Sequence, residues 1–573
     1  MFSISVIGGE RCPHGYMVME VVEGPGKHGS REMGPVEGRP KNLTKTKKKS
    51  KRVLLISPPF RRPQYVRYRS GENLGIRYIA SYLKKHGHSA EVFEPSVLRL
   101  SIKDTAKFIL KEDYDLVGFT VPYGGLYPNI VKVIRTIRDH GFEGHVTLGG
   151  HFATFEHKDI LRYNKNVDSV VRHEGEITLL ELVSNLEDKN LMNILGLSYR
   201  VSKQINVNSP RPLIKNLDYL PFPKRDEKQN NENNHFTMIT SRGCYGNCSF
   251  CSIRAFYGFD SSLWRYRSPK NVVDEIEHLV NNYNAKVISF MDDNFIGSGK
   301  HGKKRAIEIA NEIIDRGISI YFEISCRPDD ISAPVLKDLK KAGLRHISVG
   351  IESGNNQVLK RFNKKTTVTQ NIKAIKTLRR VSISFTPYFI MFDPYTTIEE
   401  LRDNLDFLYT NKICTYRTVK NAITIYKGTP YYTRLKSNLK RAHWEYQYDF
   451  EDVNVAKIYY IVDSLGELNT LDKLFDILVY HRDTKKNLHQ KGSIAMVMED
   501  LSNQTNEFVY NIMMEIINRT IKYPSGHNSI FQIKEIQNRI HTFTEHVRNY
   551  LLTKGVGWVL KELEDCADTH GKT

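Results

Sequence analysis

The stretch CYGNCSFC at residues 244–251 places three of the chain's seven cysteines within eight positions. Cys244, Cys248 and Cys251 have the spacing Cys-x3-Cys-x2-Cys, which lets three thiolates converge on one centre. A structural zinc takes four protein ligands, and no second Cys-x2-Cys or His-x3-His follows to complete the set. A four-iron cluster held by three thiolates keeps one iron open for a ligand that is not protein. The stretch therefore favours a reactive iron–sulfur cluster, with a zinc loop or a chance grouping as the alternatives.

A series of alternating strands and helices begins immediately before these cysteines. Alternation of this kind is typical of parallel βα units, and six units across residues 236–432 predict a partial TIM-type (β/α)6 barrel. The cysteine loop follows the first strand, at the carboxyl end where barrels carry catalytic residues. The expected strands are 236–240, 287–291, 319–325, 346–351, 384–391 and 422–426, and the helices are 271–282, 303–316, 333–342, 369–381 and 398–409.

A second α/β series precedes the barrel and predicts an N-terminal doubly wound, Rossmann-like domain at 53–216. Its expected strands are 53–57, 90–94, 116–121, 145–148 and 168–172, its helices are 73–86, 103–111, 129–140 and 176–186, and a hairpin follows at 197–200 and 205–208. In such sheets ligands bind beyond the carboxyl ends of the strands.

Those strand ends carry the glycine-rich loops SPP, VPYGG, LGGHFATF and RHEGE. Glycine lets a backbone approach a large ligand closely, although tight βα turns explain any one of these loops equally well. For His151, and likewise for His173 and Glu174, a solvent-facing loop residue is the alternative to a ligand contact. The candidate binding residues are Thr120, Gly149, Gly150, His151, Glu174 and Gly175.

Three further segments complete the predicted organisation. Residues 1–52 are rich in Gly and Lys, which indicates a basic flexible arm, either a solvated tail or a contact for RNA or phosphate. Residues 217–235 form a Pro- and Asn-rich linker. Residues 433–573 are predicted to form a mainly helical domain, with helices at 471–480, 494–502, 507–521 and 530–552. Its aromatic cluster at 444–450 is interpreted as core packing, with a substrate lid as the alternative.

The composition indicates a soluble globular protein, with 40% hydrophobic and 26% charged residues in 573. No apolar run of about 18 residues predicts a membrane span, and the N-terminus lacks the features of a signal peptide. Seven cysteines are too sparse for a secreted disulfide framework and favour the reducing cytoplasm. The formal charge of +20 favours acidic partners, but lysine also coats ordinary soluble surfaces. We do not expect a nucleic-acid partner on this ground. We also expect the protein to be a monomer.

From these residues the sequence resembles the radical S-adenosylmethionine (SAM) superfamily over residues 236–432. That superfamily is marked by Cys-x3-Cys-x2-Cys after the first strand of a partial barrel. The resemblance implies a [4Fe-4S] cluster on the three cysteines, with its open iron chelated by the amino and carboxylate groups of SAM. It also implies reductive cleavage of SAM to a 5′-deoxyadenosyl radical, with electrons from an external flavodoxin- or ferredoxin-like donor.

The resemblance further implies SAM contacts at several strand ends. Phe250 matches the aromatic residue that packs near adenine, and Arg327 lies near SAM. Glu352 and Ser353 match residues that contact ribose or methionine. The segment IMFDP (390–394) departs from the commoner IxGxP, which puts an adenine contact there in doubt. The other matching segments are FMDDNF (290–295), ISCRPD (324–329), VGIESG (349–354) and YKGTPYY (426–432).

The preceding domain resembles the cobalamin-binding module that is joined to many radical SAM enzymes. Its loop at 58–71 lacks the Asp-x-His-x-x-Gly that supplies a lower cobalt ligand in the methionine-synthase type. The resemblance therefore implies cobalamin held without that histidine, and a degenerate domain that no longer binds a corrin is the alternative. The residues then available for the lower face are Arg61, Arg62, Tyr65, Arg67 and Tyr68.

Together these resemblances imply a cobalamin-dependent radical SAM methyltransferase acting on a small-molecule or peptide substrate. One SAM methylates the cobalamin, and a second generates the radical that activates a carbon, or in some relatives a phosphorus, for methylation. Cyclisation or rearrangement without methyl transfer is an alternative. A methylthiotransferase needs a second cysteine cluster, and residues 13–243 contain no cysteine. A cobalamin- or nucleic-acid-binding regulator would leave the cysteine loop unexplained.

Overall fold

The computed structural model describes residues 49–59, 72–98, 100–188, 190–225, 234–258, 264–442, 444–468, 470–474, 478, 488–523, 529–557 and 559–561. Ser50–Thr573 form one compact unit. Most of the predicted basic arm and the loop that carries the five lower-face candidates lie outside the described residues.

The N-terminal domain is built on a seven-stranded sheet with the order β2-β1-β3-β4-β5-β6-β7. The first five strands pair in parallel, and β6 and β7 extend the sheet as an antiparallel hairpin. The predicted doubly wound sheet is thus confirmed, with the predicted hairpin at its edge. The strands are β1 (Arg52–Ile56), β2 (Ser89–Phe93), β3 (Leu116–Thr120), β4 (His145–Gly149), β5 (Ser169–Val171), β6 (Leu197–Val201) and β7 (Gln204–Val207).

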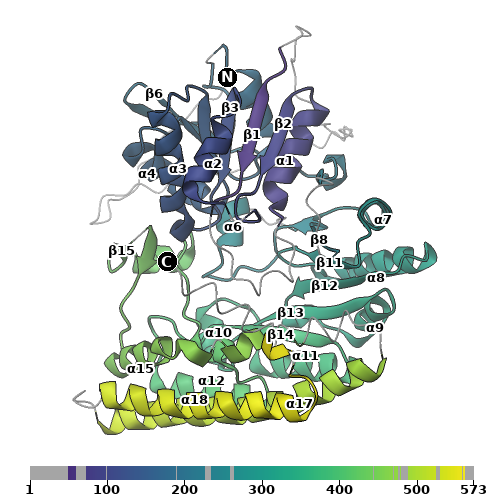
Figure 1. Cartoon of the computed structure of the whole chain (residues 1–573), viewed down its shortest axis with the longest axis vertical. Coiled ribbons are helices and arrows are strands. Elements are labelled where there is room, and N and C mark those ends of the chain that lie inside the picture. The colour runs from purple at the N-terminus through teal and green to yellow at the C-terminus, as the bar shows by residue number, and fades with distance from the viewer. Residues whose placement is uncertain are drawn as a thin grey trace, which may run out of the picture. The chain divides into compact units, whose positions relative to one another are not determined.

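Helices cover both faces of this sheet (Figure 1). The alternating residues of β1 explain why, because Leu54 and Ile56 pack with one set of helices while Val53 and Leu55 pack with the other. The first face carries α2 (Ile102–Ile109), α3 (Tyr127–Asp139) and α4 (His151–Tyr163), and the second carries α1 (Leu74–Lys85) and α5 (Glu176–Ser184).

Helix α4 is absent from the sequence prediction, which treated LGGHFATF as a loop. The chain leaves β4 through Gly150, whose φ of 90° lies in the left-handed region, and His151 is already the first helical residue. Its apolar side chains Phe152, Ala153 and Ile160 are buried against the sheet. The interpretation of His151 as a loop histidine is therefore wrong. Packing against the sheet stabilises a helix at this position, where the local sequence indicates a turn.

The barrel domain contains a five-stranded parallel sheet with the order β14-β13-β12-β11-β8. The sixth predicted strand, 422–426, is reduced to a single parallel bridge between Phe392 and Ala422. Ile423 and Ile425 are instead buried in a separate apolar cluster with Tyr431. The strands are β8 (His235–Met238), β11 (Val287–Phe290), β12 (Tyr321–Cys326), β13 (Leu344–Glu352) and β14 (Ser384–Phe389), beside a small pair β9 (Ser241–Arg242) and β10 (Arg265–Tyr266).

The barrel helices alternate with these strands, as the sequence predicted. Three of them begin with a capping box, at Thr367 with Gln370, at Thr397 with Glu400 and at Thr415 with Thr418. The helices are α6 (Ser252–Tyr257), α7 (Pro269–Tyr283), α8 (Gly299–Asp315), α9 (Ala333–Lys341), α10 (Asn356–Arg361), α11 (Val368–Val381), α12 (Ile398–Thr410), α13 (Tyr416–Lys420) and α14 (Pro430–Leu435).

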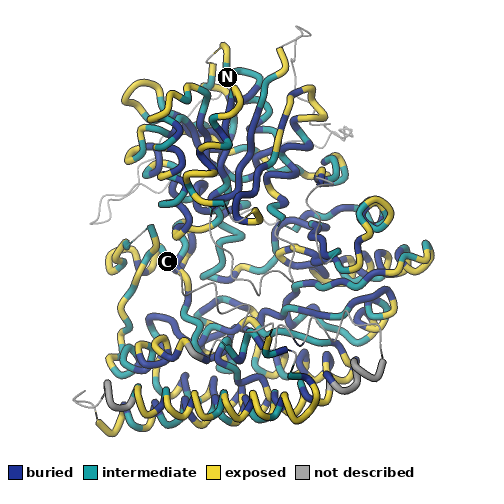
Figure 2. Tube along the Cα trace, in the orientation of Figure 1, coloured by how far each residue is buried: buried dark blue, intermediate teal, exposed yellow. Residues whose placement is uncertain are grey.

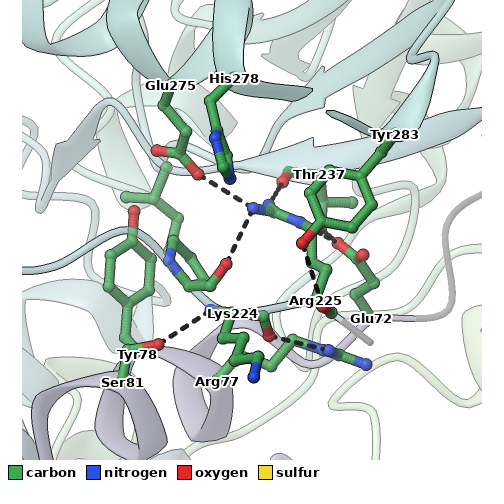
Figure 3. Close-up of polar contacts among 12 residues, drawn as sticks. Glu72, Arg77, Tyr78, Ser81, Lys224, Arg225, Thr237, Glu275, His278 and Tyr283 are labelled. Carbon is green, nitrogen blue, oxygen red and sulfur yellow. Dashed lines mark hydrogen bonds and ion pairs between the residues drawn. The ribbon is translucent and has the colours of Figure 1, made fainter. Parts of the chain in front are cut away.

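The described end of the linker is fixed between the two domains rather than free (Figure 3). Arg225 is 2% exposed and donates to the Thr237 carbonyl at 2.6 Å and to the Glu275 carboxylate at 3.2 Å. Its Nε also reaches the Glu72 carboxylate at 3.3 Å. The preceding Lys224 donates its N–H to Ser81 on α1 at 2.8 Å. One arginine therefore ties the linker to the N-terminal domain, to β8 and to α7.

The C-terminal region is mainly helical, as predicted, with α15 (Val453–Ser464), α17 (Leu488–Lys522) and α18 (Ser529–Thr553). A hairpin of β15 (Lys440–Ala442) and β16 (Glu445–Gln447) precedes them. The two helices predicted at 494–502 and 507–521 are one helix, and Asn506 within it accepts from the Cys414 N–H at 2.8 Å and donates to the Tyr409 carbonyl at 3.2 Å. Figure 2 shows buried and exposed residues alternating along α17 and α18.

None of the helices in the described parts of the chain combines the length and the apolar composition that a bilayer crossing requires.

Candidate active site

The cysteine loop begins where β8 and β9 end and is held there by two aspartates from the end of β11. Asp292 accepts the N–H groups of Thr240 at 2.6 Å and Ser241 at 2.9 Å. Asp293 accepts the N–H of Gly243 at 2.8 Å, directly before Cys244. The segment FMDDNF, matched earlier to the second strand end, therefore sets the path of the backbone into the cysteines.

The three cysteine thiols lie close enough to influence one another. Burial raises the pKa of Cys244 to about 11, and the nearby Cys248 raises it further. Burial raises the pKa of Cys251 to about 12, with contributions from both other cysteines. Among the described residues, no three His, Cys, Asp or Glu side chains gather as tightly as the ligands of a single ion. A four-iron cluster is larger than an ion, so its thiolate ligands lie further apart.

Arg327 lies against the cysteine loop, where the sequence placed it. Its Nη1 lies 3.8 Å from the Cys248 sulfur, and its Nη2 donates to the Lys364 carbonyl at 2.6 Å. A Cβ at Gly246 would lie 2.7 Å from the same guanidinium, so glycine is required for this approach. A fixed positive charge beside the thiols favours thiolates and an anionic cluster.

Lys364 is a site residue that sequence reasoning missed. It is 4% exposed, and its Nζ is 2.9 Å from the Glu352 carboxylate. Burial opposes the charge, but Glu352 and the neighbouring Cys248 raise the pKa of Lys364 overall. The pair links the end of β13 to the cysteine loop. No local sequence pattern identifies Lys364, because the segment KKTT (364–367) is typical of an ordinary basic turn.

The remaining predicted SAM residues surround the same end of the barrel. Phe250 packs edge to face on Phe362, with ring centroids 5.3 Å apart. Glu352 has a φ of 64°, which turns the chain sharply at the end of β13. The Ser353 hydroxyl is fully buried and donates to Asn404 at 2.8 Å. Ser353 therefore shapes this turn, and its predicted contact with SAM remains a prediction.

A cavity of about 320 Å³ lies at the carboxyl ends of the N-terminal strands. Its wall combines those strand ends with Arg242, Phe256 and Tyr257 of the barrel domain. It is the place where the predicted corrin would bind, and for that reason we call it the corrin cavity below. The six candidate residues of the N-terminal loops, Thr120, Gly149, Gly150, His151, Glu174 and Gly175, all line it.

The corrin cavity is shaped by glycines and contains an unsatisfied imidazole. A Cβ at Gly150 would lie 2.9 Å from the Thr120 hydroxyl, and one at Gly118 would lie 2.9 Å from a Leu55 methyl. The His151 ring lies against Phe256, with centroids 4.0 Å apart and the rings tilted by 57°, and its Nε2 is buried without a hydrogen-bond partner. Burial lowers the pKa of His151 to about 4, so the imidazole is neutral at physiological pH. These residues allow the edge of a ligand to approach closely and leave the His151 Nε2 available to one of its polar groups.

Glu174 joins the corrin cavity to the barrel. Its carboxylate accepts from Arg242 at 2.9 Å, from Arg265 at 2.8 Å and from the N–H of Ile214 at 2.8 Å. These interactions lower the pKa of Glu174 although burial opposes them. Glu176 pairs with Arg242 as well, at 2.5 Å. Glu174 therefore lines the cavity, but its carboxylate is engaged by the protein, and its contact with cobalamin remains a prediction.

Two families match the chain in the regions described above. The radical SAM superfamily matches residues 238–408, which contain the cysteine loop and the parallel sheet of the barrel. The B12 binding domain matches residues 66–183, which contain most of the N-terminal domain.

Curated relatives match more than half of the chain. An uncharacterized methyltransferase of Pyrococcus horikoshii is 33% identical over 365 residues, covering 62% of this chain and 77% of that protein. An anaerobic magnesium-protoporphyrin IX monomethyl ester cyclase of Rubrivivax gelatinosus is 30% identical over 356 residues, covering 57% of this chain and 60% of the cyclase.

A solved structure shares the fold over most of the chain. The cobalamin-dependent S-adenosylmethionine radical enzyme OxsB, with aqua-cobalamin and S-adenosylmethionine bound, superposes with a TM-score of 0.69 at 20% identity. The match covers 90% of this chain and 84% of OxsB. The chain therefore shares its overall fold with that protein.

Proposed function

Because the chain belongs to the radical SAM superfamily and carries a B12-binding domain, we propose that it transfers a methyl group from methylcobalamin to an unactivated atom of its substrate. The acceptor is a carbon, with phosphorus as the alternative atom, in a small molecule or peptide. When bound, the [4Fe-4S] cluster with SAM supplies a 5′-deoxyadenosyl radical, and cobalamin supplies the methyl group.

The chain's own residues supply position and electrostatics for this reaction. Cys244, Cys248 and Cys251 would hold three irons, and Arg327 balances the negative charge of the thiolates. The Lys364–Glu352 pair braces the loop on the side of β13. In the other domain the glycine cradle and the neutral His151 would hold the corrin.

The observation that carries the proposal is the shared wall between the two sites. Arg242 lines the corrin cavity and stands two positions before Cys244, and Tyr257 lines it six positions after Cys251. One segment therefore borders both predicted cofactors. Methyl transfer assisted by a radical requires both cofactors to reach one substrate, and this adjacency supports it.

Anaerobic reconstitution with iron and sulfide tests the cluster. We expect iron–sulfur absorption in the parent chain and its loss in Cys248→Ala, with Cys326→Ala as a matched buried-cysteine control that keeps it. Expression with cobalamin should yield protein with bound corrinoid, and Gly150→Leu should abolish that binding. Absence of iron–sulfur absorption, or of corrinoid in the parent chain, would overturn the proposal.

Ring formation is a second candidate, favoured by the match to the protoporphyrin ester cyclase. The product mass separates the two reactions, because methylation adds a CH₂ to the substrate whereas oxidative ring closure removes hydrogen.

Two accompanying proposals concern the setting of the reaction. The five described cysteines are free thiols, which supports a reducing cytoplasmic compartment. We assign the reduction of the cluster to an external flavodoxin- or ferredoxin-like protein. We also propose that the chain acts as a monomer.

A further inference from the structure

A second and larger cavity, of about 700 Å³, lies between α4, the segment 422–427 and the β15–β16 hairpin. We call it the aromatic chamber. Its wall includes the rings of Phe152, Phe155, Tyr426, Trp444, Tyr448 and Phe450. Its volume is within the range of about 300–1,000 Å³ that is usual for small-molecule sites.

The aromatic chamber adjoins both cofactor sites. Phe155 lines the chamber, and its ring centroid is 6.5 Å from those of His151 and Phe256, which line the corrin cavity. A Cβ at Gly428 would lie 3.4 Å from Ala255 on the cysteine-loop helix α6 and 3.6 Å from Phe155. Burial, with a contribution from Cys251, raises the pKa of the Tyr426 hydroxyl. The chamber is therefore placed where a substrate would meet both cofactors.

The basic side chains of the aromatic chamber are engaged by the protein. Lys427 lies 3.0 Å from Glu156 and 3.1 Å from Asp159. Lys440 lies 2.8 Å from Asp449. The Lys420 ammonium stands 4.8 Å from the Tyr416 ring centroid, and burial lowers its pKa. An anionic substrate would therefore have to compete with carboxylates of the protein for Lys427 and for the exposed Lys440, and with burial and the Tyr416 ring for Lys420.

Two acidic side chains at the aromatic chamber differ from Lys427 and Lys440, because they are not paired with an opposite charge in the described part of the chain. Glu445 on β16 and Asp463 on α15 are exposed, and within the described residues neither forms an ion pair. A protonated amine can pair with these carboxylates while its apolar body lies against the aromatic rings. The chamber thus combines a large aromatic wall with a negative rim.

We propose that the aromatic chamber binds the methyl acceptor, and that this acceptor is a mainly apolar, ring-bearing small molecule with a protonated amine. The inference deepens the proposed function, on which the role as acceptor rests. It excludes phosphorylated and carboxylated substrates as the preferred class, because their charge would oppose Glu445 and Asp463.

Binding of three matched naphthalene probes to the reconstituted full-length protein tests the chemistry of the chamber. The probes are 1-naphthylmethylamine, 1-naphthalenemethanol and 1-naphthylacetate, measured by calorimetry. We expect the amine to bind about fivefold more tightly than the alcohol and the carboxylate to bind most weakly. The double variant Glu445→Gln, Asp463→Asn should remove the preference for the amine while it keeps the affinity for the alcohol.

The location is tested by filling the chamber. Thr424 is an exposed residue of the chamber wall. The substitution Thr424→Trp therefore adds a ring to the chamber without placing a new side chain in the core. We expect it to abolish binding of all three probes. Tyr460→Ala removes a 68% exposed aromatic residue of α15 that is outside the wall and should leave binding unchanged. Equal or tighter binding of the carboxylate, or full binding to Thr424→Trp, would overturn the inference.

Probe binding is measured without turnover. Failure of the iron–sulfur or corrinoid test would therefore overturn the proposed function, and failure of the probe test would overturn only the substrate class and its site.

Discussion

Besides the linker contacts of Arg225, two polar junctions in the described part of the chain connect the N-terminal domain to later segments, and they differ in burial. The cluster-side junction consists of Glu174 and Glu176 with Arg242 and Arg265, whose side chains are all less than 10% exposed. The hairpin-side junction consists of Glu156 and Asp159 with Lys427 and Arg441. Its two cations are 29% and 30% exposed, although Glu156 is only 1% exposed.

The difference assigns different tasks to the two junctions. A buried charge that loses its partner is expensive, so the cluster-side junction holds the corrin cavity and the cysteine loop in one fixed geometry. A water-exposed pair is weak and exchanges easily with solvent. The hairpin-side junction lies beside the aromatic chamber, and its half-buried cations should make it the weaker of the two, so we expect the β15–β16 hairpin to open more easily than the cluster-side junction.

The largest effect is expected from breaking the cluster-side junction. Glu174→Gln leaves Arg265 buried without a carboxylate partner, because Glu176 pairs only with Arg242. We expect the free energy of unfolding to fall by about 3–5 kcal/mol, measured by urea denaturation. Glu112→Gln is the control, because Glu112 is 55% exposed in its pair with Arg52. A loss as small as that of the control would contradict the fixed role of this junction.

The next largest effect is expected from acid, which should lower the stability of the region around His151 in the corrin cavity. The pKa of His151 is about 4 in the folded chain, against about 6.5 for an exposed histidine. The unfolded chain therefore binds the extra proton first, and the free energy of unfolding falls by about 3 kcal/mol as pH drops from 7 to 4. His151→Phe should remove this part of the slope in urea denaturation at several pH values.

The matched control for that experiment is His140→Phe, at the exposed end of α3, which should keep the full slope. If His151→Phe also kept it, the imidazole would not be buried as described.

The cysteine loop, the two α/β series and the helical C-terminus were predictable because each depends on local spacing. Cys244, Cys248 and Cys251 lie within one loop, and strand–helix alternation repeats along the chain. The end of β4 shows where local reasoning fails. Gly149 and Gly150 predict a turn, and only the packing of Phe152 and Ile160 on the sheet shows that a helix starts at His151.

Site residues that act through long-range pairs could not be predicted. Lys364 meets Glu352 because β13 and the following turn fold together, and Arg242 meets Glu174 across two domains. The aromatic residues at 444–450 were predicted as core packing or a lid. Trp444 packs on Tyr127 at 4.7 Å between centroids, which agrees with core packing, and it also lines the aromatic chamber, where a lid role remains a prediction.

The linker arginine should show an intermediate effect. Arg225→Met removes four hydrogen bonds, but Glu275 keeps its pair with Arg267 at 2.5 Å. Because no buried carboxylate of α7 loses its last partner, we expect a loss of about 2 kcal/mol in the free energy of unfolding. Arg380→Met, an exposed arginine of α11, is the control. A loss equal to that of Glu174→Gln would show that the linker, rather than the cluster-side junction, holds the domains together.

The smallest effect is expected at the hairpin-side junction, where it should be local. Lys427→Met leaves Glu156 paired with Arg441 at 2.9 Å and with Tyr446 at 2.6 Å, so global stability should change by less than about 1 kcal/mol. Opening of the β15–β16 hairpin should become about fivefold more frequent for a local loss of 1 kcal/mol, measured by hydrogen exchange of its amides. Lys440→Met removes a pair exposed on both sides and should leave that exchange unchanged. If Lys427→Met lowered the global free energy of unfolding as much as Glu174→Gln, the hairpin would be part of the rigid core and could not open for a substrate.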